Sequence, residues 1–273
     1  MMRNKRAMTR RAFMMDLGKG TLAVAVFGMT AAACSTDDSA PATTAAGATA
    51  SNDPGTTSPA TTTPATTTPA TVSPTGPGPV SWERVNLGFV SAYVLARRGE
   101  AVIVDTGVSG SEGEIEASLA VLDLTWSDVA HVVVTHLHGD HQGSLPAVMN
   151  LATGATGYAG TLDIPEIASP RELVALEDGD SVFDLEIIAT PGHTPGHISV
   201  YDRAGGLLVA GDAMNGANGG VIGANPDFTP DMASANASIK KMADFAFDTV
   251  VFGHGDPVVG SASDQVTQLA AGL

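Results

Sequence analysis

The sequence predicts a domain of the α/β class, and two observations support this prediction. Short runs of aliphatic and β-branched residues, such as 132–135, alternate with stretches in which apolar residues recur at helical spacing. Most of the strand-like runs end at or close to an Asp or a His. Because α/β proteins commonly place their sites at the carboxyl ends of strands, a cleft is expected along one edge of the sheets.

Strands are predicted from runs rich in aliphatic, β-branched and aromatic residues. In chain order they span 85–96, 101–105, 132–135, 186–189, 198–202, 207–210 and 249–252. The turn at 97–100 and the Gly205-Gly206 pair are expected to make hairpins of the runs beside them. Every residue of 132–135 is β-branched, which indicates a buried strand.

Helices are predicted from apolar periodicity and from the residues at their first turns. The first begins at Glu112, with acidic residues where the helix dipole favours them. Ser144 and Pro146 mark the second, as N-cap and first-turn proline. The third opens at Thr229-Pro230, and a closing helix is expected at 265–269. The third presents one apolar stripe, made of Met232, Ala235, Ile239, Met242 and Ala246.

The 273-residue chain is expected to fold only from Val80 onward. Residues 80–273 are long enough to bury one sizeable core. Residues 34–79 form a Thr/Pro/Ala-rich tract in which the unit PATTT recurs every five residues, so they are predicted to be a disordered tether. Cys34 is the only cysteine, so no intramolecular disulfide is available.

Residues 1–33 carry the pattern of an export signal. Basic residues precede an apolar run at 21–33, which is too short to cross a hydrocarbon core of about 30 Å. The segment from Thr9 to Met14 contains Arg10-Arg11 and resembles a twin-arginine signal. Three alanines before Cys34 resemble a lipobox, although they also suit ordinary signal peptidase. We expect an exported protein, lipid-anchored through Cys34 at the outer face of the cell membrane or secreted.

Acidic residues dominate the folded region. From Val80 to Leu273 there are 25 Asp and Glu against 7 Lys and Arg, a formal charge of −18. Such a surface repels phosphate backbones, so no nucleic acid is expected as a partner. The acidity also suits solubility alone. The sequence carries no signal for an oligomeric state.

A cluster of metal-binding side chains follows the strand at 132–135. Three imidazoles and one carboxylate fall close together, at His136, His138, Asp140 and His141. Imidazole and carboxylate groups are the usual protein ligands of zinc and iron. Other strand-like runs lead into Asp105, His193, Asp212 and His254. Because strand ends at one edge can meet in a single cleft, we expect these side chains to share one site.

This ordered set resembles the metallo-β-lactamase superfamily. The family's H-x-H-x-D-H signature stands at 136–141, and later ligands occur in the contexts P-G-H-T-P-G-H, G-D and G-H-G. The resemblance covers residues 80–273, which it identifies as a catalytic domain. It implies a four-layer αββα sandwich, in which two facing mixed sheets carry helices outside and a metal cleft along one edge.

The resemblance also implies two Zn²⁺ ions per chain, with iron or manganese as alternative metals. The first ion would be held by His136, His138 and His193, and the second by Asp140, His141 and His254. Asp212 would bridge both, and a metal-bridging hydroxide would attack a substrate carbonyl. Asp140 would pass a proton to the leaving group, and Asp105 would fix the tautomer of a ligand histidine. His197 is expected to form structural hydrogen bonds and not to bind metal.

Position 212 helps to distinguish reactions within the family that this chain resembles. Enzymes that open β-lactams usually carry cysteine or serine there, whereas Asp212 resembles glyoxalase-II-like thioesterases and lactone-cleaving enzymes. We therefore expect a small carbonyl substrate: an ester, a thioester or a lactone. A β-lactam hydrolase, a mono-iron persulfide dioxygenase and a non-catalytic surface lipoprotein stay as alternatives. Ranges 143–186 and 214–228 are expected to build the substrate pocket, because loops around a metal cleft generally set specificity.

Overall fold

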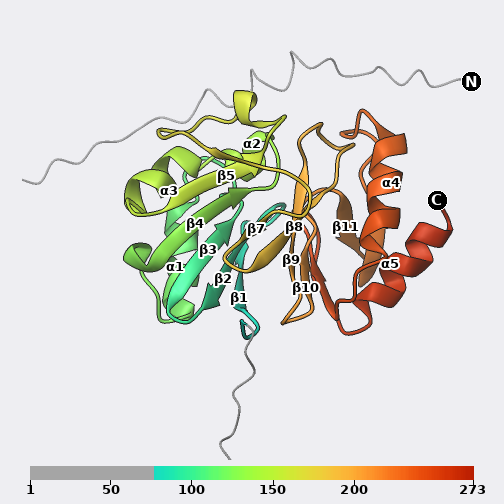
Figure 1. The fold of residues 1–273 in the computed structure, drawn as a ribbon, viewed down its shortest axis with the longest axis horizontal. Coiled ribbons are helices and arrows are strands. Elements are labelled where there is room, and N and C mark those ends of the chain that lie inside the picture. The colour runs from blue at the N-terminus through green and yellow to red at the C-terminus, as the bar shows by residue number, and fades with distance from the viewer. Residues whose placement is uncertain (1–76) are drawn as a thin grey trace, which may run out of the picture. The chain divides into compact units, whose positions relative to one another are not determined.

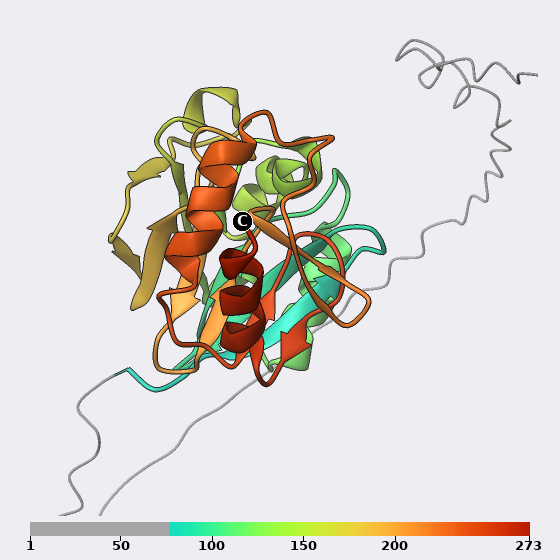
Figure 2. The same ribbon diagram turned by 90° about the vertical axis from the view of Figure 1, so that its right-hand side faces the viewer.

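The computed structural model describes residues 77–273, which form four layers (Figure 1). Two six-stranded sheets face each other. Helices α1 (Glu112–Val121) and α3 (Leu145–Leu151) lie outside the first sheet, and α4 (Met232–Met242) and α5 (Ala262–Ala271) outside the second (Figure 2). The predicted αββα sandwich is therefore confirmed. The predicted export signal, Cys34 and the predicted tether up to residue 76 lie outside the described residues.

The first sheet has the strand order β1-β2-β3-β4-β5-β6. Its strands are β1 (Ser81–Asn86), β2 (Ser91–Arg97), β3 (Glu100–Val104), β4 (Val129–Val134), β5 (Thr156–Gly160) and β6 (Val174–Leu176). Strands β1 to β3 are antiparallel, whereas β3 to β6 run parallel. The carboxyl ends of β3 and β4 therefore lie side by side at one edge.

The second sheet has the order β14-β13-β10-β9-β8-β7. Its strands are β7 (Ser181–Val182), β8 (Leu185–Ala189), β9 (Ile198–Asp202), β10 (Leu207–Val209), β13 (Thr249–Val251) and β14 (Val258–Val259). Strands β10 and β13 are parallel, and β9 is antiparallel to both β8 and β10. The ends of β8, β10 and β13 consequently share one edge of this sheet.

Short elements complete the described chain. They are the 3₁₀ turns Trp126–Asp128 and Ile164–Glu166, helix α2 (Gly139–Gln142), and the two-stranded ribbon of β11 (Met214–Ala217) and β12 (Gly220–Gly223). Among the described residues, no helix has the length and apolar character needed to cross a bilayer.

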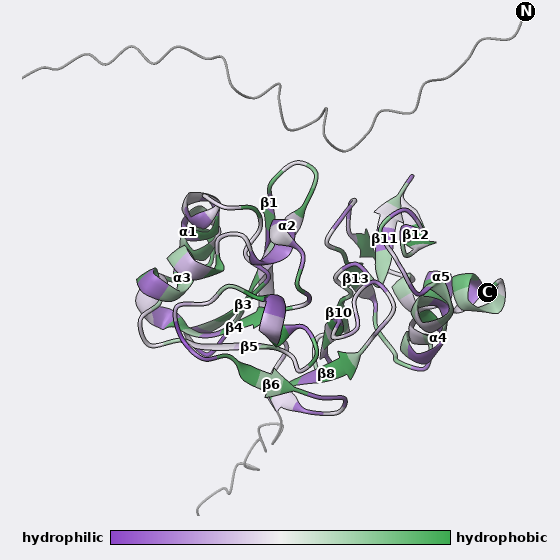
Figure 3. Cartoon of the chain, turned by 90° about the horizontal axis from the view of Figure 1, so that it is seen from above, coloured by the Kyte–Doolittle hydropathy of each residue, from purple (hydrophilic) through white to green (hydrophobic). Residues whose placement is uncertain are grey.

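Hydrophobic residues fill the spaces between the layers, and the strands of both sheets are largely apolar (Figure 3). One cluster lies under α1 and α3, with Ile115, Leu119 and Val148 fully buried. A second joins the two sheets, and a third packs α4 and α5 against the second sheet. Each face of each sheet is thus covered, which explains why 132–134 could be read as a buried strand.

The prediction of one strand at 85–96 is wrong, because a tight turn divides it into β1 and β2. Gly88 adopts φ +88°, and the side-chain oxygen of Asn86 accepts its N–H at 3.0 Å. The N–H of Leu87 donates to the carbonyl of Val90 at 3.0 Å. The two halves pair as a hairpin with Phe89 in its turn.

Range 214–228 was expected to be a loop throughout, but residues 214–223 of it form the β11–β12 hairpin. Asn218 and Gly219 both have positive φ, as a two-residue turn of this kind requires. The apolar stripe of the third predicted helix also ends early. Helix α4 stops at Met242, and Ala246 lies beyond it, because the chain turns there to bury Phe247 in the third core cluster.

A buried ion pair joins the two sheets at the end of β2 and β9. Arg97 Nη2 lies 2.8 Å from Asp202 Oδ1, and the two side chains are 5% and 1% exposed. Asp202 Oδ2 also accepts the N–H of Val80 at 2.9 Å, and Arg97 Nη1 donates to the Phe183 carbonyl at 2.7 Å. Losing Asp202 would leave the buried Arg97 charge with one weaker partner, the exposed Asp184 carboxylate 3.7 Å from Nη1.

We expect Asp202→Ala to lower the free energy of unfolding by about 3–5 kcal/mol, because Arg97 would stay buried without its close, buried partner. Urea unfolding followed by circular dichroism measures this loss. The matched control is Glu186→Ala, which breaks the exposed pair with Arg203. That variant should unfold like the wild type. Equal midpoints for all three proteins would contradict the importance of the buried pair.

Candidate metal centre

The structure brings all seven predicted metal ligands to the edge where the strands of both sheets end. His136 and His138 follow β4, and Asp140 and His141 lie on α2. His193 comes after β8, Asp212 after β10 and His254 after β13. The parallel course of these strands within each sheet is what places distant parts of the chain together.

The side chains of His136, His138 and His193 form the first group. His136 Nε2 lies 3.1 Å from His138 Nδ1, which in turn lies 2.9 Å from His193 Nε2. The three nitrogens fall within 4.8 Å of one another. This is the set expected to hold the first metal ion.

The second group contains Asp140, His141 and His254, whose ligand atoms also fall within 4.8 Å of one another. Asp140 Oδ2 lies 3.4 Å from His254 Nε2 and 3.9 Å from His141 Nε2. This is the set expected to hold the second ion. Asp140 and His254 remain partly exposed, whereas His141 is fully buried.

Asp212 stands between the two groups. Its Oδ1 lies 3.3 Å from His141 Nε2, and its Oδ2 lies 3.3 Å from His193 Nε2 and 3.2 Å from His254 Nε2. Gly253 makes this approach possible, because a Cβ there would lie 2.1 Å from Asp212 Oδ1. One carboxylate therefore faces histidines of both groups.

The donor atoms fit divalent metal ions. His141 Nε2 and Asp212 Oδ1 are buried and have no hydrogen-bond partner, although such atoms are rarely left unpaired. His138 Nδ1 faces a ring nitrogen of His136 and one of His193, and a single proton on it cannot form a hydrogen bond to both. A shared cation would satisfy these atoms together, and nitrogen and carboxylate donors suit zinc.

Hydrogen bonds outside the cluster aim the histidine rings into it. His141 Nδ1 lies 2.8 Å from Asp105 Oδ2, and His254 Nδ1 donates to the Phe89 carbonyl at 2.6 Å. His193 Nδ1 lies 3.2 Å from the hydroxyl of Thr229. Each contact leaves the Nε2 atom of the same ring facing the centre, as expected for metal ligands. The sequence indicated Asp105, but it gave no sign of Thr229 or of the Phe89 carbonyl.

The β1–β2 hairpin holds the segment that carries His254. Besides the Phe89 contact, Ser91 N donates to Gly253 O at 2.8 Å, and the Tyr93 hydroxyl donates to Phe252 O at 2.8 Å. Arg84 Nη2 donates to Gly255 O at 2.9 Å. The hairpin thus fixes the backbone on both sides of this histidine.

His197 lies behind the cluster and takes part in two hydrogen bonds. Its Nδ1 lies 2.8 Å from the Thr190 hydroxyl, and its Nε2 accepts the backbone N–H of Asp212 at 3.0 Å. Both ring nitrogens are therefore occupied, which agrees with the expected structural role. Through the second bond His197 helps to place Asp212.

Burial and neighbouring charges set the protonation of the site. Burial lowers the pKa of His193 to about 4 and that of His197 to about 3. Hydrogen bonds to Asp140 and Asp212 raise the pKa of His254 to about 10. Burial alone would raise the pKa of Asp212, but His254 and His141 outweigh it and hold that pKa well below its usual range. A metal ion and a proton would compete for His254 Nε2.

A cavity of about 590 Å³ opens directly beside the cluster. It is lined by Phe89, His138, Gly139, Asp140, His193, Asp212, Asn215, Asn225, Phe228 and His254. Range 214–228 contributes to it as predicted. The prediction for 143–186 is wrong, since none of the lining residues comes from that range. Within that range, Asp163 instead accepts the N–H of Leu137, in the loop of 136–138.

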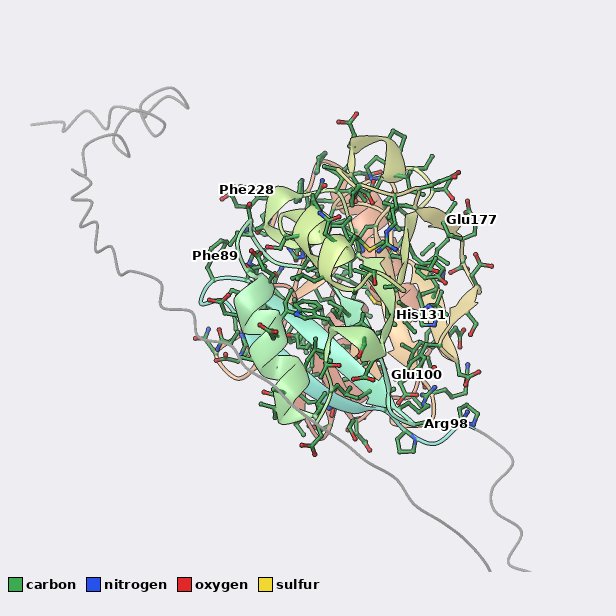
Figure 4. All side chains as sticks on the ribbon, turned by 90° about the vertical axis from the view of Figure 1, so that its left-hand side faces the viewer. Phe89, Arg98, Glu100, His131, Glu177 and Phe228 are labelled. Atoms are coloured by element: carbon green, nitrogen blue, oxygen red, sulfur yellow. The ribbon has the colours of Figure 1, made fainter. Side chains whose placement is uncertain are left out.

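Phe89 and Phe228 lie on the same side of the molecule (Figure 4). Their side chains are 62% and 67% exposed. Phe89 belongs to the hairpin turn that the sequence did not reveal. The cavity therefore joins a polar floor of candidate metal ligands to two exposed aromatic rings.

Comparison with curated proteins gives relatives of moderate identity. Beta-lactamase-like protein 2 homolog from Caenorhabditis elegans is 28% identical over 199 residues, which are 70% of this chain and 62% of that protein. Hydroxyacylglutathione hydrolase from Aeromonas hydrophila is 31% identical over 164 residues, 59% of this chain and 58% of that protein. A probable metallo-hydrolase from Methanocaldococcus jannaschii is 34% identical over 159 residues, 56% and 70% of the two chains. The chain thus spans less than two thirds of the length of the first two of these relatives.

Solved structures share the fold. A metallo-beta-lactamase family protein from Thermus thermophilus has a TM-score of 0.56 at 23% identity, covering 71% of this chain and 78% of its own. Metallo-beta-lactamase SMB-1 has a TM-score of 0.56 at 20% identity, covering 72% and 91%. The model of the metallo-beta-lactamase superfamily matches residues 85–254, which contain all seven ligand positions. The relatives of this chain include proteins named as hydrolases. By the match of the family model, this chain belongs to the metallo-beta-lactamase superfamily.

Proposed function

We propose that this chain is a binuclear zinc hydrolase that cleaves an ester, a thioester or a lactone. The observation that carries the proposal is the position of Asp212, whose carboxylate faces His193 of the first group and His141 and His254 of the second. Such a carboxylate is suited to bridge two ions. Relatives named as hydrolases support the reaction class.

The roles of the residues follow from their positions. Two zinc ions, when bound, would supply a water of lowered pKa and polarise a carbonyl. His136, His138 and His193 would hold one ion, with Asp140, His141 and His254 holding the other, and Asp212 shared. Asp140 also lines the cavity, and its contact with His254 lowers its pKa against the opposing effect of burial. Its ionised carboxylate is placed at the cavity to take up a proton and to return it to the leaving oxygen or sulfur.

The cavity wall favours a substrate whose remaining part is uncharged and apolar. Phe89 and Phe228 offer aromatic surface, and Asn215 and Asn225 offer neutral amides. No Lys or Arg occurs among the described residues that line this cavity. Glutathione thioesters and β-lactam antibiotics carry carboxylates, which this wall would leave without a basic side-chain partner. Neutral esters and lactones suit it better.

Metal removal should abolish hydrolysis, and zinc should restore it. The full-length wild-type chain is expected to contain two zinc ions by elemental analysis. Asp212→Ala should lower kcat/KM on its best ester or lactone by more than about 100-fold, a larger loss than outer contacts usually cause. Equal activity of Asp212→Ala and wild type would contradict the mechanism.

The same analysis separates the alternatives. One iron per chain, with oxygen uptake on a persulfide, would replace the hydrolase by a dioxygenase. Zinc binding without turnover of any ester, thioester, lactone or β-lactam would indicate a non-catalytic protein.

Substrate preference should depend on the aromatic rings of Phe89 and Phe228, which favour uncharged, apolar groups. In a panel of neutral and carboxylate-bearing esters and lactones of equal acyl length, the neutral members should have the higher kcat/KM. Phe228→Ala should lower kcat/KM for long apolar acyl groups by about tenfold, because a Phe side chain contributes about 1.5–3 kcal/mol when it is fully buried by a ligand. Val259→Ala is the control, since Val259 is 70% exposed and does not line the cavity. Preference for the charged members would argue for a β-lactam or glutathione substrate.

We further propose that the protein is exported by the twin-arginine route and anchored through Cys34. The proposal rests on the sequence pattern of residues 1–34 alone. Labelling with a fatty-acid precursor should mark the wild type and not Cys34→Ser, and only the wild type should sediment with membranes. Export of both proteins as free soluble chains would support ordinary signal-peptidase cleavage.

A further inference from the structure

Asp163 is a fully buried carboxylate that lies outside both groups of proposed ligands. It sits just after β5, at the start of the 3₁₀ turn Ile164–Glu166, and its exposure is 0%. All of its side-chain hydrogen bonds come from neutral donors, and these donors belong to two loops. A buried acid of this kind requires an explanation, because removing a carboxylate from water is costly.

The first loop that Asp163 holds carries His136 and His138. Asp163 Oδ2 accepts the N–H of Leu137 at 3.1 Å, and Leu137 is the residue between these two histidines. The carbonyl of Leu137 accepts a hydrogen bond from Gln142 Nε2. Both polar groups of the residue between the two ligands are therefore fixed.

Gln142 connects the same loop to the chain around Asp163. Its Nε2 also donates to the Glu166 carbonyl at 3.0 Å, and its Oε1 accepts the N–H of Ala168 at 2.7 Å. The segment 163–168, which we name the strap, thus contacts the ligand loop directly through Asp163 and indirectly through Gln142. Neither contact involves the side chain of a proposed ligand.

The second loop that Asp163 holds carries His193. Asp163 Oδ2 accepts the hydroxyl of Thr194, and its Oδ1 accepts the N–H of Gly196 at 2.8 Å. The backbones are in close contact here, since a Cβ on Gly196 would lie 2.5 Å from Asp163 N. One carboxylate therefore joins the loop after β4 in the first sheet to the loop after β8 in the second.

We infer that Asp163 is a positioning residue for the first metal site, formed by His136, His138 and His193. It sets the separation of the two loops that contribute these ligands. Its side-chain hydrogen bonds reach no residue of the second set, Asp140, His141 and His254. Loss of the carboxylate should therefore weaken one site and spare the other. This inference rests on the proposed metal-binding function.

The test measures zinc affinity at each site separately, by competition with a chromophoric chelator on the full-length chain. His254→Ala keeps the first ligand set, and His138→Ala keeps the second. Asp163→Asn is introduced into each background. We expect the zinc affinity to fall about 10- to 100-fold in the His254→Ala background, as is usual for residues that orient ligands, and to change less than about twofold in the other.

A matched control separates positioning from general destabilisation. Asp202 is also buried, accepts a backbone N–H and pairs with Arg97. It ends β9, which runs antiparallel to β8 and β10, so it lies at the sheet edge opposite the ligands. Asp202→Asn should lower stability in urea and leave both zinc affinities unchanged. The cobalt-substituted proteins give a second readout, because the visible spectrum of the first site should change in Asp163→Asn only.

A milder pair of variants covers the case in which Asp163→Asn does not fold. Thr194→Val removes one donor to Asp163, whereas Thr194→Ser keeps the hydroxyl. Valine should weaken the first site and serine should restore it. Unchanged affinity in the folded variants, or equal losses at both sites, would overturn the inference. A wild-type chain that binds no zinc would overturn the proposed function as well, whereas two tightly bound ions in both wild type and Asp163→Asn would overturn only this inference.

Discussion

The whole site depends on one physical constraint: ring nitrogens of three histidines face one another at about 3 Å in a buried cluster. Lone pairs held so close repel unless protons or a cation lie between them, and burial disfavours protonation of His136 and His193. The carboxylate of Asp212 has an unpaired oxygen in the same place, since its buried Oδ1 has no hydrogen-bond partner. Divalent ions would remove the repulsion between the ring nitrogens and would pair with the Asp212 oxygen. The hydrogen bonds to the outer nitrogens of the rings hold these donor atoms in place.

Each proposed ion would also connect the two sheets. The first set takes His136 and His138 from the first sheet and His193 from the second, and the second set is divided in the same way. Opposite charges join the sheets elsewhere, at Arg97 and Asp202. Because ligands that bind only the folded state stabilise it, metal binding and the packing of the sandwich should support each other.

Phe89 in the β1–β2 hairpin contributes both to the cavity and to the orientation of His254. The carbonyl of Phe89 orients His254, while the ring of the same residue lies at the cavity beside Phe228. A substrate that contacts this ring therefore contacts the segment that holds a proposed metal ligand. Asp163 holds the loops that carry the first set. Asp105 contacts both sets, through His141 and through Thr135, whose hydroxyl lies 3.0 Å from His136 Nδ1.

The sequence by itself determined the ligand types, their order and their positions after strands, because H-x-H-x-D-H and the later strand ends are local patterns. The resemblance that these patterns carry also predicted the four layers correctly. Only the tertiary structure decided what holds the ligands: Asp163 lies 26 residues from Leu137, and the Phe89 carbonyl lies 165 residues from His254. A lone aspartate in a loop resembles any surface acid, and a backbone carbonyl has no side-chain signature. Such partners are defined by the packing of loops from neighbouring strands and from both sheets, which no local spacing records.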